Sequence, residues 1–131
     1  MAGELNLQTL LASMQAELVH GVYVFATLPD RQLPQGLSPR MMFQEAEGST
    51  LILLQAEADA HGLAYEFPSR MITLNIHSSL DAVGFMARIA SALAEHGMGV
   101  NPVAGFYHDH IFVPLGREQD ALTVLRELSS R

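Results

Sequence analysis

Cysteine and lysine are both absent from this 131-residue chain. Without cysteine there can be no disulfide framework, no thiolate zinc site and no cysteine nucleophile. Without lysine the strong side-chain cations are seven arginines, which are scattered along the sequence, and the formal net charge is −7. Because nucleic acids and anionic membrane surfaces are bound by clustered cations, the sequence disfavours both as partners.

Long apolar runs are also missing, and none approaches the ~18–20 residues that a membrane-spanning helix needs. The N-terminal segment Met1–Leu5 lacks the basic and apolar regions of a signal peptide. There is no nucleophile elbow, phosphate-binding loop or dinucleotide fingerprint. We therefore expect a cytoplasmic protein that is not an enzyme and has no cofactor.

The sequence that remains is that of a globular protein with a substantial core, with 49% hydrophobic and 16% charged residues. On average it is slightly apolar. This predicts that some of its surface is covered in a homodimer or a larger homo-oligomer.

The first half of the chain shows one helical pattern followed by strand patterns. Asn6 is a candidate N-cap, and the apolar residues that follow it recur at the spacing of one helical face. Three prolines then interrupt the chain after a β-branched and aromatic strand. The expected elements, in order, are a helix 7–15, a strand 21–27, a loop 28–39, a hairpin 41–54, a short helix 56–61 and an edge strand 63–67.

The second half begins with the clearest alternation of apolar and polar residues in the chain, Met71–His77. Ser78 and Asp81 have the spacing of a capping box, which predicts a helix from about Leu80 to His96. Gly97 is expected in the left-handed conformation after it. A second hairpin follows, with strands 100–107 and 110–114 and a turn at residues 108–109, and then a last helix 118–128.

Both halves therefore contain a strand, a hairpin and a helix, but only the second has a long helix between strand and hairpin. In the first half the proline-rich loop stands in that place. With a fourth strand supplied from elsewhere in the chain, the pattern predicts an α+β, ferredoxin-like fold of the βαββαβ type, an antiparallel sheet with helices on one face. The expected domains are residues 1–68 and 69–131.

Four blocks of sequence resemble one known family: Tyr23–Ala26, Phe43–Gly48, Thr73–Leu80 and Tyr107–His110. With them the chain resembles the ACT-domain superfamily, and within it a family of small stand-alone tandem ACT-like proteins of uncharacterised function. The resemblance spans nearly the whole chain and makes the first half a degenerate ACT-like unit. It implies a regulatory sensor that binds a small molecule, most often an amino acid, and that acts on a partner such as a metabolic enzyme or transporter.

The resemblance places the ligand at the start of the helix in the second half. A helix N-terminus offers free N–H groups that suit a carboxylate, Asp81 suits an α-amino group, and Gly84 allows close approach. Loop 28–39 or a second subunit would close the site. The alternative is that Ser78 and Asp81 only cap the helix. The candidate ligand-binding residues are His77, Ser78, Ser79, Leu80, Asp81, Ala82, Val83, Gly84, Asn101 and Glu45.

The segment Tyr107–His110 suggests a second possibility, because histidine and aspartate are metal ligands. A turn at residues 108–109 would point the two histidines apart, so we expect no metal site. There are two alternative functions. One is a metal-binding or enzymatic protein that uses this segment with His77 and the carboxylates of Glu45 and Glu47. The other is a purely structural assembly partner.

Overall fold

The computed structural model describes residues 3–130 and divides them into two compact units. The central unit is Gly21–Ser69, and the terminal unit combines the chain up to His20 with the chain from Arg70 onward. The strand β5 (Tyr65–Leu74) begins in the central unit and ends in the terminal unit. The domain ranges 1–68 and 69–131 stay a prediction. In the structure, the first segment of the chain packs with its C-terminal half.

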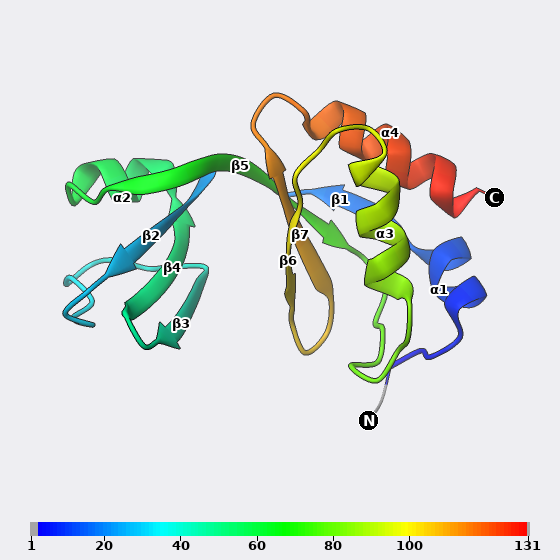
Figure 1. The fold of residues 1–131 in the computed structure, drawn as a ribbon, viewed down its shortest axis with the longest axis horizontal. Helices are drawn as coiled ribbons and strands as arrows, with labels where there is room; N and C mark the ends of the chain where they lie inside the picture. Colours follow the sequence, from blue (N-terminus) through cyan, green and yellow to red (C-terminus); the bar gives the residue numbers. More distant parts are fainter. Residues whose placement is uncertain (1–2, 131) are drawn as a thin grey trace. The chain divides into compact units, whose positions relative to one another are not determined.

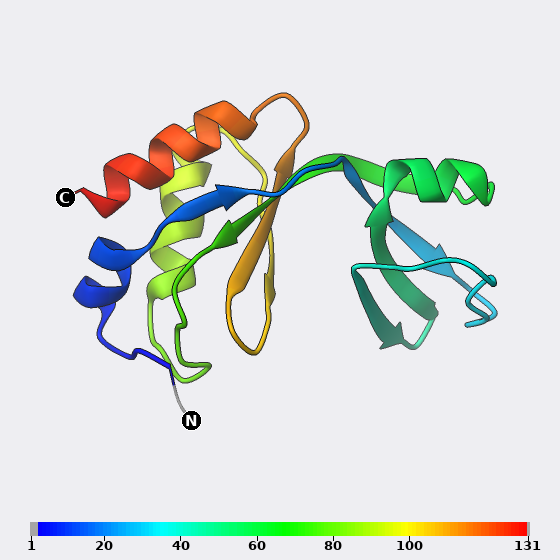
Figure 2. The same ribbon diagram turned by 180° about the vertical axis from the view of Figure 1, so that it is seen from behind.

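The terminal unit has its strands in the order β1-β5-β7-β6 (Figures 1 and 2). Its strands pair antiparallel at the β1–β5 and β6–β7 contacts. The short strand β1 supplies the fourth strand that the sequence pattern required from elsewhere. The elements of this unit are α1 (Leu7–Ser13), β1 (Ala16–Leu18), the end of β5, α3 (Phe85–Ala94), β6 (Asn101–Ala104), β7 (Asp109–Pro114) and α4 (Glu118–Ser129).

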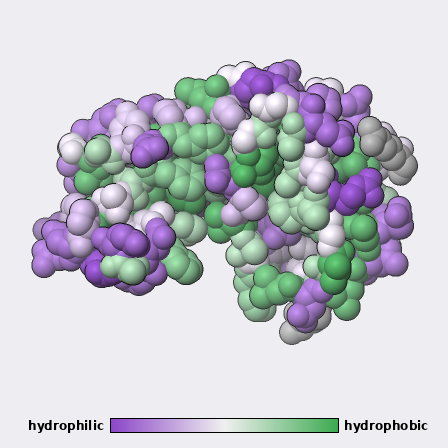
Figure 3. All heavy atoms as spheres, in the orientation of Figure 1, coloured by the Kyte–Doolittle hydropathy of each residue, from purple (hydrophilic) through white to green (hydrophobic). Residues whose placement is uncertain are grey.

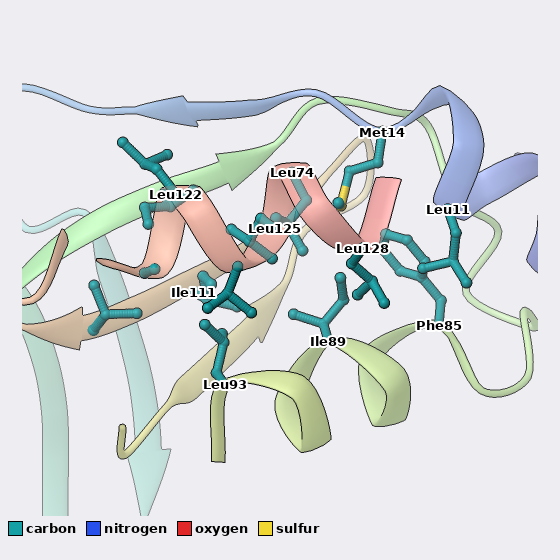
Figure 4. Close-up of a cluster of buried hydrophobic side chains, with 14 of the residues drawn as sticks. Leu11, Met14, Leu74, Phe85, Ile89, Leu93, Ile111, Leu122, Leu125 and Leu128 are labelled. Atoms are coloured by element: carbon teal, nitrogen blue, oxygen red, sulfur yellow. The ribbon is translucent and has the colours of Figure 1, made fainter. Parts of the chain in front are cut away.

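Three helices cover one face of this sheet. Ile72 and Leu74 of β5 share that face with alternate residues of β7, and they join a single buried cluster with the apolar stripes of α1, α3 and α4 (Figure 4). The stripe predicted for the last helix is confirmed, since Ala121, Leu122, Leu125 and Leu128 are all buried. The predicted N-cap is also confirmed, because the Asn6 side chain accepts a hydrogen bond from the N–H of Thr9 at 3.0 Å.

The central unit has the strand order β3-β4-β2-β5, and each of its neighbouring strands pairs antiparallel. Its other elements are β2 (Tyr23–Leu28), β3 (Met41–Glu45), β4 (Gly48–Leu54) and α2 (Gln55–Ala60). The proline-rich loop runs from β2 to β3 without a helix, as predicted. Leu37 of this loop is buried and packs into the smaller core of the unit.

Three expectations about local structure were wrong. The strands 63–67 and 71–77 are one strand, β5, which passes through Pro68. Tyr23 pairs with Ser69 and Phe25 with Glu66, so β5 holds one extra residue between these pairs. Such a bulge leaves a residue outside the hydrogen-bonded ladder, and proline has no N–H to contribute to that ladder.

The helix α3 begins at Phe85 rather than at about Leu80. Gly84 precedes it with φ +90°, a left-handed conformation that ends any helical run from residues 80–83. Gly97 after the helix is left-handed with φ +74°, as predicted.

The second hairpin turns earlier than predicted. Ala104 pairs with Asp109, and the N–H of Gly105 donates to the carbonyl of His108 at 2.9 Å, so Phe106 and Tyr107 form the tip. The loop is two residues longer than a turn at residues 108–109 would be. Gly105 allows this close approach, because a Cβ there would lie 2.9 Å from the His108 carbonyl oxygen.

Candidate functional site

The candidate site of the terminal unit lies in the segment between β5 and α3. Residues 77–81 line a pocket of about 170 Å³ together with Gly3 and Phe106. Five of the ten predicted ligand-binding residues are therefore gathered in one place: His77, Ser78, Ser79, Leu80 and Asp81. We call this cavity the turn pocket.

The N-terminal segment helps to hold the turn pocket in shape. The N–H of Glu4 donates to the carbonyl of His77, and the carbonyl of Glu4 accepts from the N–H of Ser79, each at 2.9 Å. Gly3 is needed beside them, since a Cβ at this position would lie 2.4 Å from the carbonyl oxygen of His77. No pattern in the sequence pointed to Gly3, which lies far from the turn along the chain.

The two serines of the turn are buried and hydrogen-bonded within the protein. Ser78 Oγ donates to Asp109 Oδ2 at 2.8 Å, which ties the turn to the start of β7. Ser79 Oγ accepts from the N–H of Asp81 at 3.0 Å, so the turn closes on itself four residues before the helix begins. The expected capping box, in which Ser78 and Asp81 cap the helix, is therefore wrong.

Two polar groups of the turn pocket remain available to a ligand. The carboxylate of Asp81 is exposed and has no hydrogen-bond or ion-pair partner among residues 3–130. The hydroxyl proton of Ser79 has no acceptor within the same residues. A carboxylate and a hydroxyl donor at one pocket suit the ammonium and carboxylate groups of an amino acid.

The other predicted site residues do not line the turn pocket: Ala82, Val83, Gly84, Asn101 and Glu45. Val83 is 83% exposed, and Gly84 forms the left-handed residue before α3. Asn101 pairs with Phe112 at the end of the β6–β7 hairpin that is farthest from its tip. Glu45 belongs to the central unit, where its Oε1 accepts from the hydroxyl of Thr50.

Aromatic rings gather beside the turn pocket. The ring of Tyr107 lies 5.7 Å from that of His77 and 5.0 Å from that of Phe106, measured between centroids. Phe106 and Tyr107 are 63% and 65% exposed. Hydrophobic surface is visible at this end of the terminal unit in Figure 3, where the β6–β7 hairpin and the segment before α3 lie. We call the three residues His77, Phe106 and Tyr107 the aromatic tip.

The side chains of the two histidines of the second hairpin lie close together, contrary to the prediction that they point apart. The rings of His108 and His110 are 6.4 Å apart, and His110 Nδ1 is 3.0 Å from Thr73 Oγ1. Asp109 instead accepts from Ser78. Among residues 3–130 no three histidine, aspartate or glutamate side chains gather as a metal site would require. No described helix is long and apolar enough to cross a membrane.

Comparison with known families gives two matches. Two models, both described as ACT domain, match residues 2–70 and 66–127. A search of curated proteins finds no significant match.

Solved structures that resemble the chain include a protein of unknown function from Vibrio cholerae, described as a possible transport protein. It is 43% identical, with a TM-score of 0.83, and the match covers 94% of this chain and 95% of that one. A protein from Agobacterium tumefaciens is 16% identical over 88% of this chain and 89% of its own, with a TM-score of 0.75. The ligand-free regulatory subunit of aspartate kinase from Thermus thermophilus is 10% identical over 90% and 98%, with a TM-score of 0.62.

Proposed function

This chain belongs to the ACT domain family, and from that membership we propose that it is a regulatory module that binds an amino acid in the turn pocket and catalyses no reaction. The observation that carries the proposal is the convergence of residues 77–81 on one cavity with an unpaired carboxylate. The fold that it shares with aspartate kinase regulatory subunits supports a regulatory role.

The ligand is held by its common amino-acid groups. The Asp81 carboxylate meets the ammonium group, and the Ser79 hydroxyl donates to the carboxylate. Phe106 and Leu80 provide apolar contact for the side chain. A volume of about 170 Å³ is below the ~300–1,000 Å³ of pockets for drug-sized ligands, which favours a small free amino acid.

Regulation requires that the ligand bind one arrangement of the protein better than another. The surface around the turn pocket is apolar, with Leu80 71% exposed beside the aromatic tip. We propose that a second copy of the chain covers this surface, so that the ligand contacts two subunits and favours the assembled form. The regulated partner is a metabolic enzyme or a transporter.

The catalytic alternative has less support. Glu45 and Glu47, the candidate acid–base pair, are both exposed on the β3–β4 hairpin. A general acid–base pair is normally tuned by burial or by neighbouring groups. The structural-partner alternative is favoured by the exposed aromatic tip, and it predicts an assembly that no small molecule affects.

The test is a thermal-shift screen of ligand-free protein against the twenty amino acids, followed by calorimetric titration. A ligand at ~100 times its Kd adds roughly 2.7 kcal/mol to the free energy of unfolding, which raises Tm by several degrees. Asp81→Asn should abolish that shift. Glu95→Gln, which changes an exposed carboxylate at the end of α3, is the matched control and should leave it intact.

Two results would refute the proposal. One is the absence of any shift with all twenty amino acids, and the other is full binding by Asp81→Asn. An oligomer whose size is the same with and without amino acids would support the structural-partner alternative instead.

A further inference from the structure

The central unit contains a pocket of its own, with a volume of about 300 Å³. The end of the proline-rich loop forms one wall, and residues of β2, the β4–α2 junction and α2 form the rest. The lining residues are Tyr23, Ser38, Pro39, Arg40, Leu54 and Glu57. We call this cavity the loop pocket.

Arg40 is fixed in position at the loop pocket. Its Nη2 donates to the hydroxyl of Tyr23 at 2.6 Å, and its guanidinium carbon lies 5.4 Å from the centre of the Tyr23 ring. Tyr23 is 3% exposed, so the group that holds the guanidinium is itself held by the core. A guanidinium stacked on a buried ring is preorganised for binding, because less side-chain freedom is lost when a ligand arrives.

Glu57 provides the opposite charge in the same pocket. Its Oε2 accepts from the N–H of Ser38 at 3.0 Å, which joins α2 to the end of the loop. Within residues 3–130 neither Arg40 nor Glu57 has an ionic partner. Two opposite charges thus line one cavity without neutralising each other.

The last part of the loop, which carries Arg40, is anchored by two contacts. Leu37 is buried in the core of the central unit, and the N–H of Arg40 donates to the carbonyl of Ile52 at 2.7 Å. These contacts hold the backbone that carries Arg40 in place.

We propose that the loop pocket is a second small-molecule site, which binds a zwitterion with a carboxylate on Arg40 and an ammonium group on Glu57. The remaining N–H groups of Arg40 supply the donors for the carboxylate, and Glu57 Oε1 is the acceptor for the ammonium group. Leu54 and Pro39 contact the apolar part of the ligand. The site shares no residue with the turn pocket. Binding at the loop pocket can therefore be tested independently of the function proposed above.

The test is two-dimensional NMR of the full chain, titrated with each of the twenty amino acids. Acetate and methylammonium are added in separate titrations as probes with one charge each. We expect at least one amino acid to move the backbone signals of Ser38, Arg40 and Glu57 at concentrations where acetate and methylammonium do not. The signals of Ser79 and Asp81 report on the turn pocket in the same spectra.

Two variants remove one charge each without removing the fold. Arg40→Gln should weaken binding at the loop pocket by about tenfold or more, the amount expected when a hydrogen bond to a charged group is lost. Glu57→Gln keeps an oxygen that can accept from Ser38, so it tests the charge alone. Arg88→Gln, an exposed arginine on α3, is the matched control and should have no effect.

Three results would overturn this proposal. The first is that no amino acid moves the signals of Ser38, Arg40 and Glu57, even if those of the turn pocket move. The second is that acetate alone moves them equally, which would indicate a simple anion site. The third is unchanged affinity in both Arg40→Gln and Glu57→Gln. Binding at the loop pocket that persists in Asp81→Asn would support it.

Discussion

The two units have the same order of strands but different covers. The strand order is β1-β5-β7-β6 in the terminal unit and β5-β2-β4-β3 in the central unit. The two orders correspond when β1 takes the place that β5 has in the central unit. Three helices bury one face of the terminal sheet, whereas the central sheet is covered by α2 and by Leu37 of the loop. The strand order therefore does not depend on a helix such as α3 between strand and hairpin. In the central unit a loop that buries one leucine stands in its place.

Each unit has a pocket beside the connection whose cover differs between them. In the terminal unit this is the connection from β5 to β6, and in the central unit it is the connection from β2 to β3. The terminal unit uses the start of that connection, residues 77–81, and the central unit uses its end, residues 38–40. Where the helix is present, the pocket lies in front of it. Where it is absent, Arg40 at the end of the loop supplies the charged group.

The greatest loss of stability is expected when one buried leucine is truncated in the core of each unit. Leu93 of α3 is fully buried, so Leu93→Ala should lower the free energy of unfolding by about 3–5 kcal/mol. Leu37→Ala should cost less, about 2 kcal/mol, because the loop can collapse more easily around the space that is left. Urea denaturation measures both values. Equal losses would show that the loop packs as tightly as the helix.

A smaller effect is expected at the glycine that starts α3. Gly84 has φ +90°, while an added Cβ would meet only the Leu7 side chain at an ordinary 3.6 Å. Gly84→Ala should therefore cost about 1–2 kcal/mol from backbone conformation alone. Gly99→Ala is the control, since a Cβ there meets nothing within 4 Å and no left-handed φ is required. If both variants unfold at the same urea concentration, the left-handed start of α3 does not contribute to stability.

The smallest change in stability is expected at α1, one of the three helices that cover the sheet of the terminal unit. Asn6→Ala removes the acceptor for the N–H of Thr9 and should cost about 1 kcal/mol. Asn6→Ser keeps an N-cap oxygen and should recover most of that loss. Thermal unfolding of the three proteins distinguishes them, and equal midpoints would mean that the cap is unimportant here.

Much of the local structure could be predicted because it depends on near neighbours in sequence. The buried stripe of α4, the left-handed Gly97 and the first hairpin all follow from short-range periodicity or turn chemistry. The prediction failed where packing across the fold overrode a local signal. Ser78 has the spacing of a capping residue, but its hydroxyl instead bonds to Asp109 across the terminal unit.

The candidate sites were less predictable than the fold. Five residues of the turn pocket were named from the resemblance, while Gly3 and Phe106 were not. A glycine before two aromatic residues was the available sign of the turn at Phe106. The pairing of Arg40 with Tyr23 had no such sign, since the two residues lie 17 positions apart and on different elements.

The types of element, the α+β class of the fold and the exclusion of disulfides and thiolate ligands all follow from the sequence alone. These depend on composition and on the spacing of residues within one turn or one strand. Tertiary packing brings distant groups together: Glu4 bonds to the turn, Phe106 lines the turn pocket, and Arg40 and Glu57 line the loop pocket. The physical reason is that such contacts arise from the packing of whole elements, which no local pattern of side chains specifies.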